Sequence, residues 1–432
     1  MRPTYFNDHV QETLPLASLR RLQDERLRQT VLRVTTGNVY YRKLFESVGL
    51  DASGIAANFR GIEDITKLPT TSKDDFRKSY PLGMCCVPKM ELREMHMSSG
   101  STGSPIVMPY TVNDLNQWAM CMARCYRMAG TQPGDVIQIT PTFGLFNGGF
   151  GMYHGARAAD LFVVPTGSGN TERQIRLAKD FGTRIFGGVA SYGIRLLEAL
   201  EASGSKLESL EIGIFGAETF TAGLKERLTN GLGIEVFDIY GMTETGGVGT
   251  LGMDCPAHCG IHVWEDQYYA EVINPATGGN VPDGTIGELV ITSLQREALP
   301  VIRFRTGDLT SIVSRDVCEC GRTHVRIAPI SGRTDDMLII KGVNFFPSQV
   351  EQALLEIPGV LPHYQIIIEE TDGVKDIRVN VEVESGVTGF VVEKHLKEKL
   401  GFSPKGDVFK AGELPRQDGK AQRVFYKSND KK

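Results

Sequence analysis

The sequence lacks any long apolar run. No stretch of the 432-residue chain approaches the roughly 20 consecutive apolar residues that a membrane-spanning helix needs. Its first residues, Met1 to Asp8, contain no apolar core of the kind found in a secretory signal peptide. We therefore expect a cytoplasmic protein with no membrane partner. In that compartment the eight cysteines are expected to be free thiols or metal ligands rather than disulfides.

An excess of charge of one sign is also missing. The chain has 52 acidic and 47 basic side chains, which gives a formal net charge of −5. This balance gives no electrostatic reason to expect binding to nucleic acid or to an anionic membrane. Internal repeats and low-complexity segments are absent as well. The length then favours two or three domains with a large core.

What the sequence does contain is a run of small residues, Ser98-Ser99-Gly100-Ser101-Thr102-Gly103-Ser104-Pro105, between strand-like segments at 92–97 and 106–110. Glycine lets the backbone approach a ligand closely, and successive N–H groups with nearby hydroxyls can hold an anion. We interpret the run as a loop that holds nucleotide phosphates, and a flexible linker is the alternative. No lysine follows the second glycine, which excludes a P-loop of the Gly-x4-Gly-Lys-Ser/Thr type.

Short apolar segments alternate with helical ones through much of the chain. We expect helices at 14–49, 111–129, 171–180, 191–203 and 221–230, and strands at 136–139, 161–164, 212–215 and 236–239. The alternation predicts an α/β fold with mostly parallel sheets covered by helices. From about 261 to 313 the pattern is β-rich, and a small α+β domain follows a composition shift near Gly332. The predicted domains are residues 1–332 and 333–432.

Six motifs stand in a fixed order along the chain. They are Ser98 to Pro105, Gly216-Ala217-Glu218, Tyr240 to Gly247, Arg305-Thr306-Gly307-Asp308, Gly332 to Met337, and Gly419 to Arg423. Together they resemble the adenylate-forming enzymes, which include acyl-CoA synthetases, luciferases and peptide-synthetase adenylation domains. Within that superfamily the chain is similar to phenylacetate–CoA ligases, on residues 167–174, 297–306 and 331–348.

The resemblance implies a reaction in two steps. A carboxylate, expected to be an aryl acid such as phenylacetate, attacks the α-phosphate of ATP and gives acyl-AMP and pyrophosphate. The thiol of coenzyme A then displaces AMP. ATP, Mg²⁺ and coenzyme A are thus the expected cofactors, and a homodimer is common in the family. Two alternatives stay open: transfer of the acyl group to a carrier-protein thiol, and a nucleotide sensor that does not turn over.

The resemblance also assigns residues to the nucleotide. The residues expected to bind the phosphates are Ser98, Ser99, Gly100, Ser101, Thr102 and Gly103. Those expected to bind the adenosine part are Gly216, Ala217, Glu218, Asp238, Tyr240, Gly241, Met242, Asp308 and Arg333. The expected catalytic residues are Thr243, Glu244 and Lys420. Tyr240 would stack on adenine, and Asp308 would accept hydrogen bonds from the ribose hydroxyls. The ordinary alternatives are half-buried packing for Tyr240 and a turn residue for Asp308.

By the same resemblance, Glu244 would hold Mg²⁺, and Thr243 would donate a hydrogen bond to the α-phosphate. The superfamily usually has a lysine in the phosphate loop, whereas this chain has Ser104, so more of the neutralisation must come from Mg²⁺ and backbone N–H groups. By resemblance, Lys420 enters the site for adenylation only, because the C-terminal domain is mobile and rotates about a hinge at Asp335. A solvated lysine in a basic tail is the alternative.

An acid-binding slot is predicted at a strand end. It would use aromatic rings and small glycines, namely Phe143, Gly144, Phe146, Gly148 and Gly149. These side chains suit a flat aryl group. Core packing explains the same pattern equally well.

Cysteine and histidine cluster in two segments, 255–262 and 318–324. Thiolate and imidazole pairs from two segments suit tetrahedral Zn²⁺. The favoured ligands are Cys255, His262, Cys318 and Cys320, with Cys259, His258 and His324 as reserves. Four protein ligands would make the zinc structural, and four buried thiols without metal are the alternative.

Overall fold

The computed structural model describes residues 5–51, 54, 58–98, 105–218, 220–340, 343–371, 374–401, 404–416 and 422–428. The chain forms two compact units. The first comprises residues 1–188, 207–217 and 237–329, and the second comprises residues 189–206, 218–236 and 330–432.

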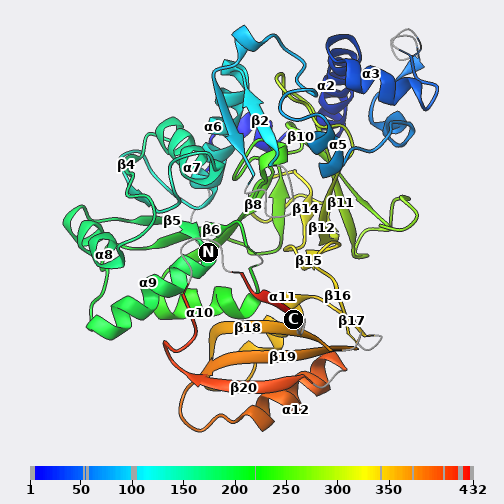
Figure 1. Ribbon diagram of the computed structural model, residues 1–432. Helices are drawn as coiled ribbons and strands as arrows, with labels where there is room; N and C mark the ends of the chain where they lie inside the picture. Colours follow the sequence, from blue (N-terminus) through cyan, green and yellow to red (C-terminus); the bar gives the residue numbers. More distant parts are fainter. Residues whose placement is uncertain are drawn as a thin grey trace. The chain divides into compact units, whose positions relative to one another are not determined.

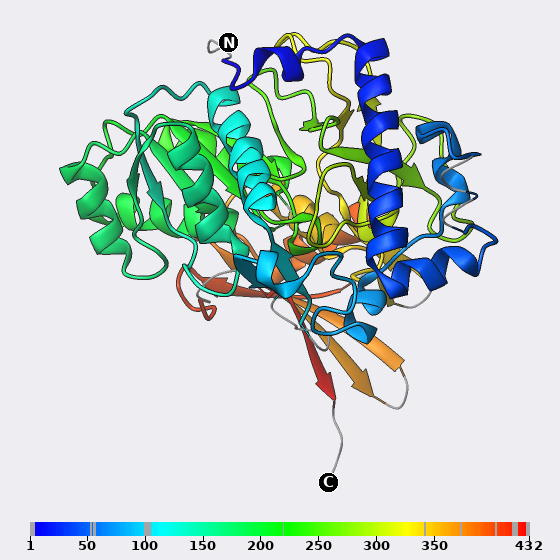
Figure 2. The ribbon, with the colours of Figure 1, turned by 90° about the horizontal axis from the view of Figure 1, so that it is seen from above.

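Short and long helices open the first unit. They are α1 (His9–Glu12), α2 (Leu16–Gly37), α3 (Val39–Glu46), η1 (Ile62–Lys67), α5 (Lys73–Lys78) and η2 (Lys89–Glu91). Figure 2 shows α2 in deep blue as one long helix. The single helix expected over 14–49 is wrong at Asn38, whose backbone is extended and whose side chain accepts a hydrogen bond from Tyr41 N. Asn38 therefore ends α2 and caps α3.

The main sheet of the described chain has nine strands in the order β13-β14-β9-β8-β7-β6-β5-β3-β4. In chain order these are β3 (Val136–Ile139), β4 (Phe162–Val164), β5 (Ile185–Val189), β6 (Ile212–Gly216), β7 (Glu235–Tyr240), β8 (Gly252–Asp254), β9 (Ile261–Val263), β13 (Ile312–Ser314) and β14 (Arg326–Ile327). The pairs β3–β4 and β3–β5 are parallel. From β7 through β8, β9 and β14 to β13 the pairs are antiparallel, so the sheet is mixed.

Helices connect the strands of this sheet. They are α6 (Val112–Met128), α7 (Asn147–Ala158), α8 (Thr171–Asp180), α9 (Ala190–Ser203), α10 (Ala222–Leu232) and the short η3 (Thr243–Thr245). Helices α6 and α7, labelled in Figure 1, pack on each other. Two glycines allow their close approach. A Cβ on Gly151 would lie 2.2 Å from the Trp118 ring, and one on Gly155 would lie 2.1 Å from Met122 Cβ.

Two further sheets complete the first unit. The hairpin β1 (Glu94–Met97) and β2 (Val107–Tyr110) flanks the predicted phosphate loop. The strands β10 (Tyr268–Ile273), β11 (Gly287–Ser293) and β12 (Phe304–Thr310) pair antiparallel. One continuous apolar core, from Leu27 to Ile327, joins these layers.

The second unit contains α9, α10 and the C-terminal elements. The latter are β15 (Gly332–Arg333), β16 (Leu338–Ile340), β17 (Val343–Phe345), α11 (Pro347–Leu355), β18 (Val360–Thr371), β19 (Val374–Val383), α12 (Gly389–Leu400), β20 (Lys405–Lys410) and β21 (Val424–Ser428). Four of these strands form a sheet in the order β20-β19-β18-β21. Helices α11 and α12 pack on each other over a separate apolar core that includes Val350, Val379 and Leu396. The predicted α/β class with a small α+β part is confirmed.

None of the helices in the described ranges combines the length and the apolar character needed to cross a lipid bilayer.

Candidate functional site

The turn after β7 carries two predicted catalytic residues. Strand β7 ends at Tyr240, and η3 then places Thr243 and Glu244, which are buried. Gly246 and Gly247 follow with φ of 97° and 117°, in the left-handed region that favours glycine. A Cβ on Gly247 would lie 2.3 Å from the Trp118 ring, so the turn is held closely against α6.

Two predicted nucleotide ligands meet at this turn. The Tyr240 hydroxyl donates a 2.6 Å hydrogen bond to Asp308 Oδ2, although the two residues are far apart in the sequence. Asp308 lies on β12, directly after Gly307, whose φ is 79°. Thr306 Oγ1 accepts a hydrogen bond from Asp308 N and donates one to Leu289 O. The carboxylate is therefore held on a rigid strand beside the aromatic ring.

The start of α7 is hydrogen-bonded to the same turn. Asn147 Nδ2 donates to Thr243 Oγ1 at 2.8 Å, and Asn147 Oδ1 accepts from Val248 N at 3.2 Å. The five predicted acid-slot residues surround this end of the helix: Phe143, Gly144 and Phe146 precede Asn147, and Gly148 and Gly149 lie in the first turn. The Phe143 and Phe150 rings meet edge to face with centroids 5.5 Å apart. Aromatic surface thus lies next to the Thr243 turn.

The end of β6 lies against the end of β7. A Cβ on Gly216 would come within 2.3 Å of Ile239 O, so glycine is needed for this approach. Ala217 follows with a φ of 66°, which is uncommon for a residue with a side chain. Gly241 is equally confined, because its Cβ would lie 2.3 Å from Gly247 O. Met242 next to it is half-buried.

Other predicted residues have local roles in the structure. The Glu218 carboxylate accepts from Ser191 N at 2.9 Å and from Ser191 Oγ at 3.0 Å, at the first turn of α9. Asp238 N donates to Asp254 Oδ1 in mid-sheet. The Arg333 guanidinium pairs with Asp335 at 2.8 Å.

Ser98 lies at the base of the predicted phosphate loop. Its Oγ accepts from Ile106 N, and its N donates to Ile106 O, both at 2.9 Å, which closes the two ends of the loop on each other. The rest of the loop, from Ser99 to Gly103, lies outside the described residues, as does Lys420.

A residue that the sequence did not suggest also faces this turn. Lys73, the first residue of α5, brings its Nζ to 3.7 Å from Glu244 Oε1. The sequence around Lys73, a helix start that follows two threonines, does not indicate a functional site. The pairing of Lys73 with Glu244 joins segments that are distant in the sequence, so no local pattern predicts it. A hydrophilic helix start is usually just solvated.

A cavity of about 50 Å³ lies in the second unit. Arg416 and Arg423, at the two ends of the segment that carries Lys420, line it. Burial raises the pKa of the adjacent Glu351 to about 7, although Arg423 opposes this from 3.5 Å. The cavity is much smaller than the several hundred Å³ typical of small-molecule sites.

The predicted zinc ligands converge. Ligand atoms of Cys255, His262, Cys318 and Cys320 all lie within 4.8 Å of one another, and all four residues are buried. The Cys255 and Cys318 sulfurs are 3.7 Å apart, and Cys320 Sγ is 3.5 Å from His262 Nε2. Three thiolates with one imidazole form one of the donor sets that tetrahedral Zn²⁺ prefers.

The reserve ligands make other contacts. Cys259 Sγ lies 3.6 Å from Cys318 Sγ and also contacts Arg326. The His258 ring pairs with Asp254 at 2.8 Å. The His324 ring contacts Gln11 O, and burial lowers its pKa to about 4.

Electrostatics within the cluster favour a thiolate. Hydrogen bonds from Cys255 and Cys318 hold the pKa of Cys320 far below its usual range, and His262 adds to this. Hydrogen bonds to Cys318 and Cys320 raise the pKa of Cys255, and the pKa of Cys318 is raised to about 11 although its hydrogen bond with Cys255 lowers it. His262 Nδ1 lies 3.3 Å from His324 O, a partner that would orient the ring toward a metal.

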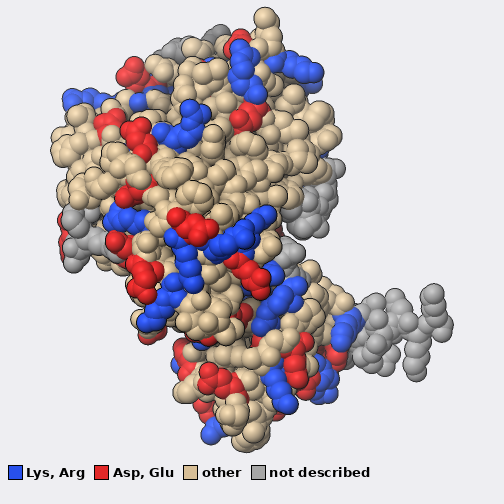
Figure 3. Space-filling model, turned by 90° about the vertical axis from the view of Figure 1, so that its left-hand side faces the viewer, with Lys and Arg blue, Asp and Glu red and all other residues tan. Residues whose placement is uncertain are grey.

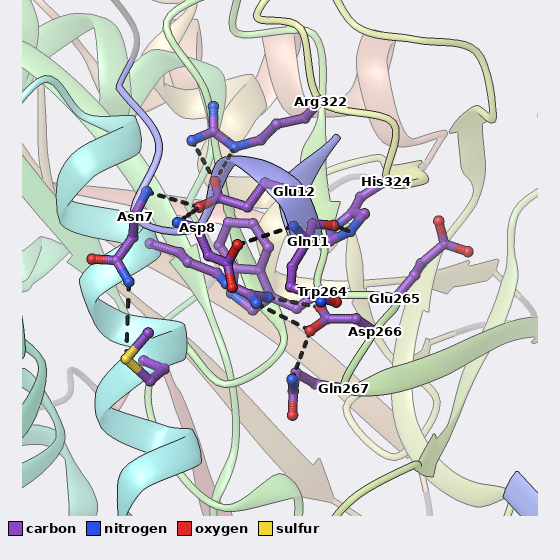
Figure 4. A network of polar contacts seen from close by, with 12 residues as sticks. Asn7, Asp8, Gln11, Glu12, Trp264, Glu265, Asp266, Gln267, Arg322 and His324 are labelled. Atoms are coloured by element: carbon purple, nitrogen blue, oxygen red, sulfur yellow. Dashed lines mark hydrogen bonds and ion pairs between the residues drawn. The ribbon is translucent and has the colours of Figure 1, made fainter. Parts of the chain in front are cut away.

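Figure 4 shows a buried polar network. It adjoins the cluster through Arg322, whose Nη1 lies 3.7 Å from Cys320 Sγ. Arg322 Nη2 pairs with Glu12 at 2.6 Å, and both side chains are fully buried. Burial alone would raise the pKa of Asp266, but the Arg124 guanidinium 2.7 Å away outweighs it and lowers the pKa to about 2. The network fixes the N-terminal segment to the cysteine-bearing part of the first unit.

Two family models match the chain. "AMP-binding enzyme" matches residues 66–295, and "AMP-binding enzyme C-terminal domain" matches residues 342–427. A phenylacetate-coenzyme A ligase from Thermus thermophilus is 40% identical, with 96% of this chain and 98% of the relative covered. The chain belongs to the AMP-binding enzyme family. Another relative of this AMP-binding enzyme, a phenylacetate-coenzyme A ligase from Escherichia coli, is 38% identical over 96% of each chain.

A solved structure agrees in fold. The crystal structure of a 2-hydroxyisobutyryl-CoA ligase in the postadenylation state, in complex with R3-HIB-AMP, has a TM-score of 0.89 and 27% sequence identity. The structural match covers 97% of this AMP-binding enzyme and 91% of the 2-hydroxyisobutyryl-CoA ligase chain. The resemblance to phenylacetate–CoA ligases inferred from the motifs is confirmed. So is the class of reaction, ATP-dependent activation of an acid through acyl-AMP and formation of a coenzyme A thioester.

Proposed function

We propose that the chain is a ligase for aryl acids of the phenylacetate class. The acid carboxylate attacks the α-phosphate of ATP and gives acyl-AMP with release of pyrophosphate, and the thiol of coenzyme A then displaces AMP. One observation carries the proposal: Tyr240 meets Asp308 beside the Thr243–Glu244 turn, and that turn is hydrogen-bonded to the aromatic start of α7. The similarity to phenylacetate-coenzyme A ligases supports the acid class.

The first half-reaction depends on positioning and on charge stabilisation. In this proposal Tyr240 stacks on adenine, Asp308 accepts hydrogen bonds from the ribose, and Thr243 donates to the α-phosphate. Glu244 fits Mg²⁺, because Mg²⁺ beside phosphates takes one or two carboxylates. Bound Mg²⁺ would neutralise phosphate charge there.

The remaining assignments from the motifs stay part of the proposal. The nucleotide set includes Ser98 to Gly103, Gly216, Ala217, Glu218, Asp238, Gly241, Met242 and Arg333, and the aryl slot is Phe143, Gly144, Phe146, Gly148 and Gly149. We also propose that residues 333–432 move as one functional domain against residues 1–332 and carry Lys420 into the site.

A screen of aryl acids tests the substrate class. We expect phenylacetate, with hydroxylated and indolyl acetates, to give coenzyme A thioesters with stoichiometric AMP and pyrophosphate. Straight-chain acids of equal length are the matched controls and are expected to react at least tenfold more slowly. Equal rates with the alkyl acids would contradict the aryl slot. Pyrophosphate exchange without any thioester would favour a carrier-protein acceptor, and no exchange at all would favour a sensor.

We further propose that Cys255, His262, Cys318 and Cys320 hold one structural Zn²⁺. The convergence of four buried donor atoms supports it. Purified protein is expected to contain about one equivalent of zinc by elemental analysis, and Cys320→Ser is expected to hold less than half an equivalent, because a three-ligand site binds more weakly.

Cys85→Ser is the matched control, since Cys85 is half-buried and is not among the four grouped donors. It is expected to keep its zinc. Wild-type protein with less than about half an equivalent, and no response to a chelator, would remove the zinc proposal.

The surface charge and the state of the cysteines bear on what the protein binds and on the compartment in which it works. On the face in Figure 3, acidic and basic side chains are interspersed, and neither sign forms a continuous field among the coloured residues. None of the eight cysteines forms a disulfide. We propose a small-molecule enzyme of the cytoplasm, where thiols stay reduced. A homodimer remains a prediction.

A further inference from the structure

The phosphate loop of this chain lacks a cation. ATP brings a triphosphate with several negative charges, and the loop from Ser98 to Pro105 contains no lysine or arginine. Backbone N–H groups and hydroxyls supply only partial charges. A full positive charge near the β- and γ-phosphates would favour ATP over AMP, and a side chain from elsewhere in the chain can provide it.

Lys73 brings an ammonium group to the predicted metal carboxylate. Its Nζ lies 3.7 Å from Glu244 Oε1. The Glu244 side chain is 5% exposed, whereas the Lys73 side chain is 31% exposed and so partly reachable from solvent. Within the described part of the chain, Lys73 is the charged side chain paired with Glu244.

The backbone below Lys73 is fixed to the strand that carries Asp308. Thr71 N donates to Arg303 O, Arg305 N donates to Thr71 O at 2.8 Å, and Thr71 Oγ1 donates to Ile302 O at 2.8 Å. Three residues later in α5, Phe76 packs edge to face on Phe304 of β12, with centroids 5.6 Å apart. Lys73 thus starts from a rigid base next to the proposed nucleotide site.

The pair itself is looser than the structural ion pairs of the same unit. Arg322 and Glu12 are 2.6 Å apart and fully buried, and Arg303 and Glu271 are 3.0 Å apart and almost fully buried. At 3.7 Å, Lys73 and Glu244 attract each other without a short hydrogen bond. A long, flexible side chain on a fixed base can therefore turn to another anion at little loss of structure.

We propose that Lys73 is the phosphate-binding cation of this enzyme. On ATP binding its ammonium contacts β- or γ-phosphate oxygens beside Glu244, in place of the lysine that the loop lacks. Lys73 then acts on ATP and pyrophosphate, and not on AMP or acyl-AMP, which have no β- or γ-phosphate. This inference rests on the proposed function for the location of the triphosphate.

Equilibrium binding of ATP and AMP to full-length Lys73→Gln tests the proposal. We expect affinity for MgATP to fall 10- to 100-fold and affinity for AMP to stay within twofold of wild type. In turnover, KM for ATP should rise, whereas attack of coenzyme A on supplied acyl-AMP should keep its rate. Lys73→Arg should recover most of the ATP affinity, because it restores the charge.

Lys78→Gln is the matched control, since Lys78 lies on the same helix and is exposed. It is expected to bind both nucleotides as wild type does. If Lys73→Gln weakened ATP and AMP equally, or left ATP affinity unchanged, the proposal would be overturned. Wild-type protein that binds ATP but forms no aryl thioester would instead overturn the proposed function, and the nucleotide comparison would still decide the role of Lys73.

Discussion

Replacing Lys420 by alanine is expected to slow acyl-AMP formation about 10²- to 10³-fold, the usual effect of removing a group that stabilises transition-state charge. Attack of coenzyme A on supplied acyl-AMP is expected to keep its rate, because we propose that Lys420 enters the site for adenylation only. The two half-reactions are measured separately, by pyrophosphate exchange and by thioester formation from synthetic acyl-AMP.

The flanks of this segment are anchored, which gives the experiment a structural basis. Arg416 pairs with the buried Glu382 at 2.8 Å, and the Arg423 guanidinium lies 4.6 Å from the centre of the Tyr364 ring. Both flanking residues thus contact the second unit. Lys427→Ala is the matched control, since Lys427 is exposed on β21, and both half-reactions should be unchanged. Equal losses in both half-reactions for Lys420→Ala would contradict the assignment to one pose.

Much of the candidate nucleotide site could be proposed from the sequence because its residues follow strand ends in a recognisable order. The apolar pattern predicts a strand at 236–239, and β7 runs from Glu235 to Tyr240, so the local sequence is enough to put Tyr240 at the strand end. Asp308 was assigned from its motif alone. The hydrogen bond from the Tyr240 hydroxyl to Asp308 depends on the tertiary structure, and no local sequence pattern predicts that β7 and β12 come together.

Helix α7 and strand β5 are not predicted from the sequence because both are rich in glycine. Helix α7 begins Asn-Gly-Gly-Phe-Gly, and β5 has two glycines in five residues, so local propensity argues against both. Packing decides otherwise, because Gly151 and Gly155, one turn apart, let α7 approach α6. The sequence does not predict a role for Lys73 for a related reason. Its position beside Glu244 depends on the approach of α5 to the Glu244 turn, which no sequence spacing indicates.

Replacing Arg322 by leucine is expected to reduce the free energy of unfolding by about 3–5 kcal/mol, because it leaves the Glu12 carboxylate buried without its partner. Both side chains are fully buried. The guanidinium also donates to Tyr5 O at 2.7 Å and lies 4.6 Å from the centre of the Phe6 ring. The change should therefore also release residues 5–13 from the first unit.

Urea unfolding followed by tryptophan fluorescence measures this loss, since both tryptophans, Trp118 and Trp264, lie in the first unit. The matched control is Arg315→Leu, which removes an equally charged side chain from a half-exposed pair with Asp283 and should change stability by less than about 1 kcal/mol. Adding Glu12→Gln to Arg322→Leu should restore part of the loss, because the stranded charge is then gone. If Glu12→Gln did not restore any of the lost free energy of unfolding, the loss would come from missing packing on Phe6 and not from the buried Glu12 carboxylate.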